Sequence, residues 1–278
     1  MTAREISLRA HDRDRSEERR DLVAEEEPLE IQIGGASIAV VMRTPGHDEE
    51  LALGFLATER VVESADDVVS IRHCSTVSEP EAEDNIVRAV LADHVAPPLE
   101  RLRRNTYASS SCGICGKATI AAALAEQTAV RDSGVRVDPA VLYGMPSTMR
   151  AAQAGFAQTG GVHAAGLFDA VGALAVLRED VGRHNAVDKV IGARLFARAP
   201  LAGHVLLVSG RVSFEIVQKA AAAGIEIVAG ISAPTSLAVR YGKELGVTVI
   251  GFLRGETMNV YACAHRVGSL HEGTSSST

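Results

Sequence analysis

The sequence lacks tryptophan, has few aromatic residues (4% of the chain) and contains no long apolar run. A membrane-spanning helix needs about 18 consecutive apolar residues, and a secretory signal needs an apolar stretch that the N-terminal residues do not provide. Four cysteines without an export signal are expected in a reducing compartment. At 278 residues and 46% hydrophobic composition, the chain is therefore expected to form one large or two modest cytoplasmic domains.

Extended clusters of lysine or arginine are also missing, and the formal net charge is −7. A protein that follows a nucleic-acid backbone needs such basic clusters to neutralise phosphates. We therefore expect neither a nucleic acid nor a membrane surface as a partner. A small anionic ligand remains compatible with this charge.

The hydrophobic pattern divides the chain into segments. The N-terminal residues carry charges of both signs, which predicts disorder. Alternating apolar residues around Gly34-Gly35 predict a hairpin over 29–43, and a helix is expected within 44–62. The predicted segments are a disordered charged arm (1–27), a smaller N-terminal α+β region (28–105), a cysteine-bearing loop and helix (106–145), a layered α/β domain (146–266) and a flexible tail (267–278).

In the α/β domain, short apolar strands alternate with helical segments, which favours a largely parallel sheet. Strands are predicted over 161–169, 173–180, 204–210, 225–230, 247–254 and 259–265, and helices over 147–158, 185–198, 213–224 and 235–246. In the smaller region, two further strands are predicted over 67–74 and 85–93.

Two cysteines, Cys112 and Cys115, lie three residues apart in the sequence SSSCGICGK. A structural zinc site needs four thiolate or imidazole ligands, whereas Cys74 and Cys263 are single residues in or next to predicted strands. A zinc deaminase needs a His-x-Glu sequence ahead of its cysteines. His163 lies after the pair and has alanine two residues later, so the sequence predicts no metal site.

Cys112 precedes a segment with strong helix propensity, KATIAAALAEQ. A helix N-terminus and the nearby Lys117 both favour the thiolate form of a cysteine. Small residues flank the pair, which suits a thiol that must reach two partners in turn. These residues alone predict a reactive cysteine and leave disulfide exchange and sulfur transfer open.

Several segments, in the same order, resemble the formate dehydrogenase accessory family of FdhD/NarQ-type sulfur carriers over about residues 29–262. The segments are RTPGHDEELALGFL (43–56), SSCGICGK (110–117), TGGVHAAGLFD (159–169), EDVGRHNAVDKVIG (179–192), LLVSGRVSFEIVQKAAAAGI (206–225), SAPTSLAV (232–239), and GFLRG with NVY (251–261).

The resemblance implies a sulfurtransferase that accepts a persulfide from a cysteine desulfurase. It implies transfer of that sulfur to the Mo-bis(molybdopterin guanine dinucleotide) cofactor, which then enters formate dehydrogenase. It also implies a cytidine-deaminase-like α/β domain without the zinc site, and a homodimer. Two other functions remain open: a thiol-disulfide redox protein, and a cofactor-binding chaperone that transfers no sulfur.

Candidate site residues follow from chemistry and from the resemblance. Cys112, nearer the expected helix N-terminus, is the candidate persulfide carrier, and Cys115 is either an assistant in sulfur release or a small packed residue. Arg183, His184, Ser209 and Arg211 follow predicted strands, where open α/β sheets place ligand crevices. Arginine suits phosphate because it offers paired donors.

Residues 252–257 form a plain β-turn by their spacing alone. The resemblance instead assigns this stretch to the guanine dinucleotide cofactor, with guanosine diphosphate as the expected fragment ligand. The residues concerned are Phe252, Leu253, Arg254, Gly255, Glu256 and Thr257. Glu256 could accept hydrogen bonds from the ring N–H and amino groups of guanine.

Overall fold

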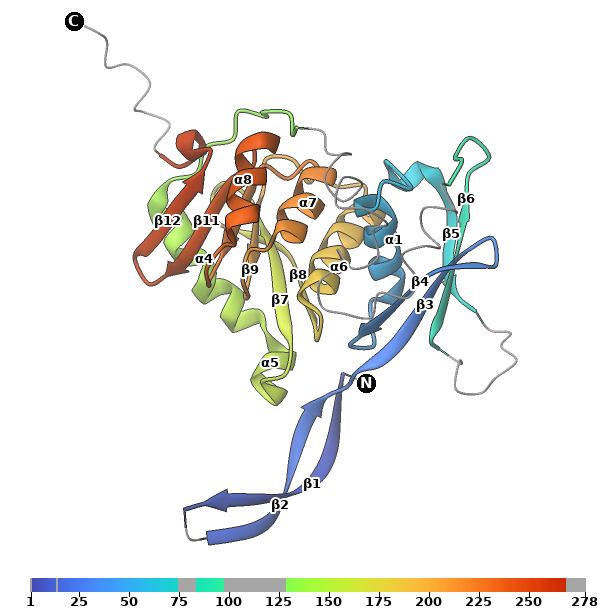
Figure 1. Ribbon diagram of the computed structural model, residues 1–278, viewed down its shortest axis with the longest axis vertical. Coiled ribbons are helices and arrows are strands. Elements are labelled where there is room, and N and C mark those ends of the chain that lie inside the picture. The colour runs from blue at the N-terminus through green and yellow to red at the C-terminus, as the bar shows by residue number, and fades with distance from the viewer. Residues whose placement is uncertain (1, 14, 75–83, 98–128, 269–278) are drawn as a thin grey trace, which may run out of the picture.

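A computed structural model describes residues 2–13, 15–74, 84–97 and 129–268 of the chain. The larger of its two domains is built on a six-stranded sheet with the order β12-β11-β10-β9-β7-β8 (Figure 1). Its strands are β7 (His163–Phe168), β8 (Leu174–Asp180), β9 (Val205–Val208), β10 (Ile227–Gly230), β11 (Thr248–Arg254) and β12 (Thr257–Ala262).

Helices cover both faces of this sheet. Helices α6, α7 and α8 contribute to one buried apolar cluster with the sheet, and α4 packs in a second cluster on the opposite face. The helices are α4 (Pro139–Ala152), α5 (Ala154–Thr159), α6 (Arg183–Phe196), α7 (Phe214–Ala222) and α8 (Ser236–Leu245), and a 3-10 turn, η3 (Ala264–Arg266), follows β12. The predicted layered α/β domain is thus confirmed.

The sheet is mixed, and the prediction that it is largely parallel is wrong. Only β9–β10 and β10–β11 pair in parallel, while β7–β8, β7–β9 and β11–β12 are antiparallel. Short connections explain two of the three antiparallel pairs. Gly255-Glu256 joins β11 to β12 and residues 169–173 join β7 to β8, and connections of this length fold a strand back beside its predecessor.

The helix predicted over 147–158 differs in length and continuity. Helix α4 begins earlier, at Pro139, after Asp138 accepts a hydrogen bond from the Ala140 N–H, and it ends at a break at Gln153 before α5. Leu142 is fully buried in the core of the larger domain. This domain therefore includes part of the segment that the sequence assigned to the cysteine-bearing region.

The smaller domain is a four-stranded sheet covered by one helix, as predicted. Its strands are β3 (Glu27–Ile33), β4 (Ala36–Arg43), β5 (Val68–His73) and β6 (Ile86–Leu91), in the order β4-β3-β6-β5, with α1 (Asp48–Thr58) and a 3-10 turn, η1 (Ala65–Asp67). Gly34 and Gly35, both with positive φ, form the predicted hairpin turn. Apolar residues of α1 such as Leu51 and Leu56 are fully buried against this sheet.

The N-terminal residues, predicted to be disordered, form a projecting hairpin of β1 (Ala3–Asp12) and β2 (Arg15–Ala24) (Figure 1). Opposite charges face each other across it, with Arg20 3.0 Å from Glu5 and Arg9 3.4 Å from Glu18. The mixed charges that favoured disorder thus pair across the two strands.

Two glycines bring helix α1 of the smaller domain against helix α6 of the larger one. A Cβ on Gly54 would collide with the backbone of Asp188, and a Cβ on Gly192 would collide with the backbone of Glu50. Figure 1 shows the two helices side by side. The two domains therefore meet through a helix crossing that leaves no room for side chains at either point.

A buried ion pair lies next to this crossing. The Lys219 ammonium donates to Asp188 Oδ2 at 2.8 Å and to Thr58 Oγ1 at 2.9 Å. Burial alone would lower the pKa of Lys219, but the Asp188 carboxylate raises it above its ordinary value. Lys219 is therefore charged. Its ion pair with Asp188 joins α7 to α6, and its hydrogen bond to Thr58 joins α7 to α1.

Across the described residues, no helix combines the length and the apolar character that a bilayer span requires.

The glycine crossing predicts a large loss of stability from a single methyl group. We expect Gly54→Ala or Gly192→Ala to lower the free energy of unfolding by about 1–3 kcal/mol or more, because backbone atoms of the facing helix must move. Gly144→Ala in α4 is the matched control, since a Cβ there meets nothing within 4 Å and alanine in a helix gains roughly 0.5–1 kcal/mol. Urea unfolding measures both, and equal midpoints for Gly54→Ala and Gly144→Ala would contradict the crossing.

The contact between Glu50 of α1 and Arg178 of β8 predicts a pH-dependent stability. Burial alone would raise the pKa of Glu50, but the paired hydrogen bonds from Arg178, at 2.5 and 2.7 Å, and the charges of Arg178 and His47 lower it to about 2. A carboxylate with a lowered pKa stabilises the fold above its ordinary pKa and loses this effect as the pH falls.

We therefore expect Glu50→Gln to be less stable than the wild type by a constant amount above pH 4.5, the ordinary value, and the gap to close as the pH approaches about 2. Thermal unfolding across this range measures the gap. Glu244→Gln, which changes an exposed pair with Arg240, should show little effect at any pH. A gap for Glu50→Gln that persists unchanged down to pH 2 would count against the Arg178 contact.

Candidate functional site

The predicted sulfur-carrying residues, Cys112 and Cys115, lie outside the described residues, as does the helix predicted after them. The other two cysteines, Cys74 and Cys263, are half-buried. The predicted ligand-binding residues belong to the larger domain.

The parallel strands β9, β10 and β11 end at one edge of the sheet, and several predicted residues lie there. Ser209 directly follows β9, and its hydroxyl oxygen accepts a hydrogen bond from the Ala164 N–H at 2.9 Å. Ser232 follows β10, and its carbonyl accepts from the Phe252 N–H at 3.1 Å. This edge is where open α/β sheets bind ligands.

Basic side chains gather at the same edge. A Cβ on Gly210 would lie 3.5 Å from His163 Nδ1 and 3.9 Å from Arg183 Cδ, so these two side chains flank the turn after β9. Burial lowers the pKa of His163, and the positive charges of Arg183, His184 and Arg211 lower it further. His163 is therefore neutral at pH 7, next to two permanent cations.

His184 is held by an acidic partner from α7. Its Nε2 lies 2.7 Å from Glu215 Oε2, and both side chains are largely buried. Burial alone would raise the pKa of Glu215, but the hydrogen bond with His184 and the nearby charges of His184, Lys219 and Arg183 lower it. Glu215 is thus ionised, and it fixes the orientation of the His184 ring at the start of α6.

The predicted nucleotide stretch is divided by the fold. Phe252 lies at the sheet edge with a φ of 54°, and the Arg254 guanidinium lies 5.4 Å from the centre of its ring. Leu253 is fully buried in the core, so its side chain cannot face a ligand. Arg254, Gly255, Glu256 and Thr257 are exposed at the turn between β11 and β12.

A cavity of about 460 Å³ opens at this edge between α5 and the strand ends. Its wall includes Ser209 and three side chains with hydrogen-bonding groups that the sequence did not assign to the site: Arg150, Gln153 and His163. His163 belongs to the segment TGGVHAAGLFD, in which the sequence alone offers it only as a zinc ligand. His163 follows Gly160 and Gly161 and begins the largely buried strand β7. This position in the sequence is the signal that could have identified it as a residue of the cavity.

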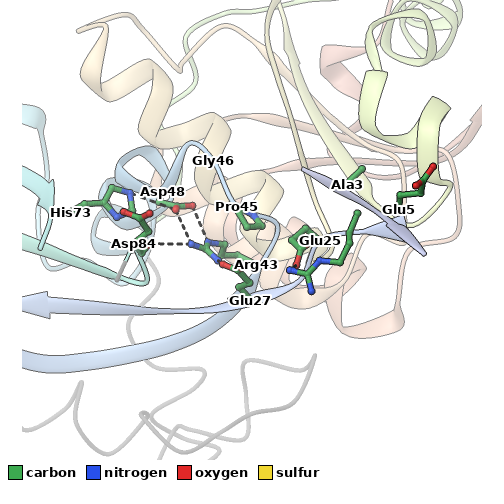
Figure 2. A pocket seen from close by; sticks show the side chains of 11 residues that line it. Ala3, Glu5, Glu25, Glu27, Arg43, Pro45, Gly46, Asp48, His73 and Asp84 are labelled. Atoms are coloured by element: carbon green, nitrogen blue, oxygen red, sulfur yellow. Dashed lines mark hydrogen bonds and ion pairs between the residues drawn. The ribbon is translucent and has the colours of Figure 1, made fainter. Parts of the chain in front are cut away.

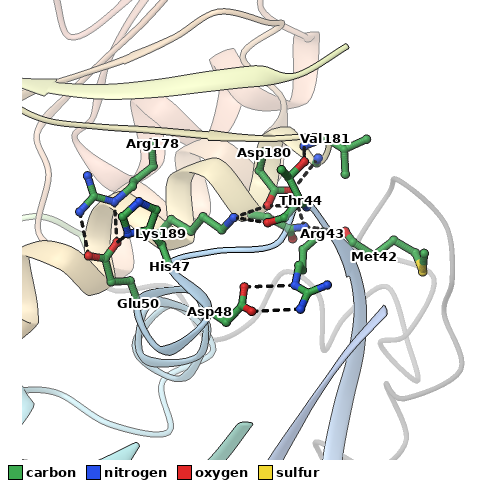
Figure 3. A network of polar contacts seen from close by, with 12 residues as sticks. Met42, Arg43, Thr44, His47, Asp48, Glu50, Arg178, Asp180, Val181 and Lys189 are labelled. Atoms are coloured by element: carbon green, nitrogen blue, oxygen red, sulfur yellow. Dashed lines mark hydrogen bonds and ion pairs between the residues drawn. The ribbon is translucent and has the colours of Figure 1, made fainter. Parts of the chain in front are cut away.

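One buried carboxylate fixes the N-terminal end of α6 (Figure 3). Asp180 Oδ1 accepts from the Gly182 N–H at 2.8 Å and from the Asn185 side chain at 2.9 Å. Its Oδ2 accepts from the Thr44 N–H at 3.1 Å and lies 2.7 Å from Lys189 Nζ. Because Arg183 and His184 form the first turn of α6, Asp180 sets their position relative to the sheet edge.

A second cavity, of about 530 Å³, lies between the N-terminal hairpin and the smaller domain (Figure 2). The Arg43 side chain, which is 1% exposed, donates to both carboxylate oxygens of Asp48 at 3.1 and 3.0 Å and also contacts Glu27. These charges are paired with one another. Within the residues described, no three His, Cys, Asp or Glu side chains are grouped as metal ligands, and the absence of a metal site stays a prediction.

Comparison with known proteins shows the family. The sequence profile of the FdhD/NarQ family matches residues 24–268. A protein named sulfur carrier protein FdhD from Mycolicibacterium paratuberculosis is 50% identical over 247 residues, which cover 87% of this chain and 90% of that protein. A protein of the same name from Nocardia farcinica is 49% identical over 262 residues, with coverage of 92% and 91%.

A solved structure described as a formate dehydrogenase accessory protein from Desulfotalea psychrophila has a similar fold. It has a TM-score of 0.77 and 25% sequence identity, and the match covers 96% of this chain and 100% of that one. This chain therefore belongs to the FdhD/NarQ family.

Proposed function

We propose that this protein carries sulfur as a persulfide on Cys112 and transfers it to the Mo-bis(molybdopterin guanine dinucleotide) cofactor of formate dehydrogenase. The observation that carries the proposal is its identity of about half with sulfur carrier proteins over nearly the whole chain, in a sequence that has a Cys-x-x-Cys pair. The proposed donor is a cysteine desulfurase, and the proposed compartment is the cytoplasm.

The chemistry of the pair accounts for both steps. The Cys112 thiolate attacks the terminal sulfur of a desulfurase persulfide, so that one S–S bond forms on Cys112 and another breaks on the desulfurase. Attack by the Cys115 thiolate on Cys112 Sγ then forms a disulfide and releases the terminal sulfur as sulfide. Cys115 supplies the two electrons that reduce this sulfur, and an external thiol must later reduce the disulfide.

The cationic sheet edge supports cofactor binding. Arg183 and Arg211 offer permanent charges beside the strand ends, and His184 is oriented by Glu215. Guanidinium groups bind phosphates through paired hydrogen bonds. In the proposal, the pyrophosphate lies at this edge and the guanine lies near the turn with Arg254 and Glu256.

The persulfide assignment predicts a mass change. After incubation with a cysteine desulfurase and cysteine, the intact protein should gain the mass of one or more sulfur atoms, and a reductant should remove it. Cys112→Ser should abolish the gain, whereas Cys74→Ser, the matched control, should retain it. A gain that survives Cys112→Ser and disappears in Cys115→Ser would reverse the roles of the pair.

Insulin reduction and a maturation assay distinguish the other two functions. A redox protein would form a reducible Cys112–Cys115 disulfide and reduce insulin without gaining sulfur. A chaperone that transfers no sulfur would support formate dehydrogenase maturation after Cys112→Ala. Either result would overturn the proposed sulfur transfer.

The cofactor assignment predicts selective nucleotide binding. Guanosine diphosphate should bind more tightly than adenosine diphosphate, because the Glu256 carboxylate can accept hydrogen bonds from the ring N–H and the amino group of guanine, a pair of donors that adenine does not offer. Arg183→Ala should weaken both nucleotides equally, whereas Glu256→Ala should reduce the preference for guanine. Arg254→Ala should weaken binding through loss of a charge, and salt should weaken it through screening.

Calorimetry with both nucleotides tests this, with Arg240→Ala on the exposed face of α8 as the control. Equal affinities, or no binding of either nucleotide to folded protein, would contradict the guanine-cofactor assignment.

A further inference from the structure

Among the described residues, no strand pairs with the outer edge of β2. Strands β1 and β2 form a two-stranded sheet by themselves, and this hairpin projects away from both domains (Figure 1). Every residue of β2 from Arg15 to Val23 is exposed. The backbone groups of an open edge can pair with a further strand, and a sheet of only two strands is marginally stable in water. The edge of β2 is therefore a candidate surface for another chain.

The base of the hairpin is fixed to the rest of the molecule. Arg4 forms an ion pair with Glu25 at 2.6 Å, and the Glu25 N–H donates to the Thr2 carbonyl at 3.1 Å. Ala24 lies against Gly161, which follows α5, since a Cβ on Gly161 would lie 3.2 Å from the Ala24 Cβ. These contacts at the base leave the outer edge of β2 open to solvent.

The two faces of the hairpin differ in how their charges are arranged. On one face, Arg20 pairs with Glu5, and Arg9 pairs with Glu18. The other face of β2 carries four charges of alternating sign, which are Arg15, Glu17, Arg19 and Asp21. No ion pair joins any of these four to another described residue. The charges of this second face are therefore available to a partner.

The alternating charges are complementary to themselves. When two copies of β2 pair in antiparallel fashion about a two-fold axis, directly opposite residues lie on the same face of the new sheet. In one register, Glu18 lies at the axis. Glu17 then faces Arg19 of the second copy, and symmetry repeats this contact. Arg15 faces Asp21 of the second copy in the same way, so every charge on this face meets its opposite.

The neighbouring registers bring like charges together. Symmetry lets the strands slide only in steps of two residues, because a step of one would place opposite residues on different faces. With Arg19 at the axis, Arg19 meets its own copy and Glu17 meets Asp21. With Glu17 at the axis, Glu17 meets its own copy and Arg15 meets Arg19. Like charges directly opposite are destabilising, so the sequence of β2 favours the register around Glu18.

One like-charge contact remains in that register, on the other face of the sheet. Glu18 meets its own copy there, and Arg9, which lies 3.4 Å from Glu18 within the hairpin, offsets the repulsion. Charged side chains on an edge strand commonly prevent pairing with other chains. On β2 the two signs alternate, so the charges oppose other partners and other registers more than they oppose a second copy.

We propose that the outer edge of β2 binds a second copy of this chain, so that two hairpins form one four-stranded sheet with Glu18 at its two-fold axis. The family resemblance implies a homodimer without indicating a surface, and this inference assigns one. All of β2 except Ala24 precedes residues 24–268, which the family profile matches. The inference does not depend on sulfur transfer, because this pairing needs neither a persulfide nor the cofactor.

Charge reversal tests this interface in solution. Sedimentation equilibrium of the full chain should show a concentration-dependent dimer for the wild type. Arg19→Glu or Glu17→Arg should raise the dissociation constant of the dimer at least about tenfold, because each change turns two attractive contacts into two repulsive ones. Arg240→Glu, which changes an exposed pair with Glu244 in α8, is the matched control and should dimerise like the wild type.

Mixing the two variants separates this register from a general effect of charge. Arg19→Glu and Glu17→Arg, combined in equal amounts, should form mixed dimers with close to wild-type affinity, because arginine again faces glutamate at both contacts. The double variant should dimerise for the same reason. A wild type that stays monomeric up to millimolar concentration would overturn the inference, as would a dimer that Arg19→Glu leaves intact. Single variants that do not associate when mixed would also overturn it.

Discussion

The crossing of α1 and α6 determines how the two domains are arranged. Gly54 and Gly192 let the backbones touch, and Lys219 joins Asp188 to Thr58 beside the contact. A buried ion pair adds little net stability compared with apolar packing, but the loss of one partner is costly. The pair therefore favours this crossing over others in which one charge would be buried alone.

Helix α6 connects the crossing to the candidate site. The N-terminal end of α6 is fixed by Asp180, which also accepts from the Thr44 N–H of the smaller domain. Arg183 and His184 lie in the next turn, at the edge where the strands end. The smaller domain thus contributes to the geometry of the cationic edge without supplying a residue to it.

Local chemistry explains which features could be predicted from the sequence. The hairpin at Gly34-Gly35 and the position of Ser209 after β9 depend on neighbouring residues. The break between α4 and α5 at Gln153 depends on hydrogen bonds to Glu179, which lies in β8. The antiparallel pairing of β7 with β9 joins segments that β8 and α6 separate in the sequence. Such contacts between distant residues leave no periodic pattern in the sequence.

In the proposed function, sulfur on Cys112 reaches the molybdenum cofactor of formate dehydrogenase. The direct measurement is to load the protein with isotopically labelled persulfide, mix it with formate dehydrogenase whose cofactor lacks the sulfur, and follow the label by mass spectrometry. We expect the label to leave the protein and to appear in the cofactor as the dehydrogenase becomes active. Activation while the label stays on the protein would rule out this transfer.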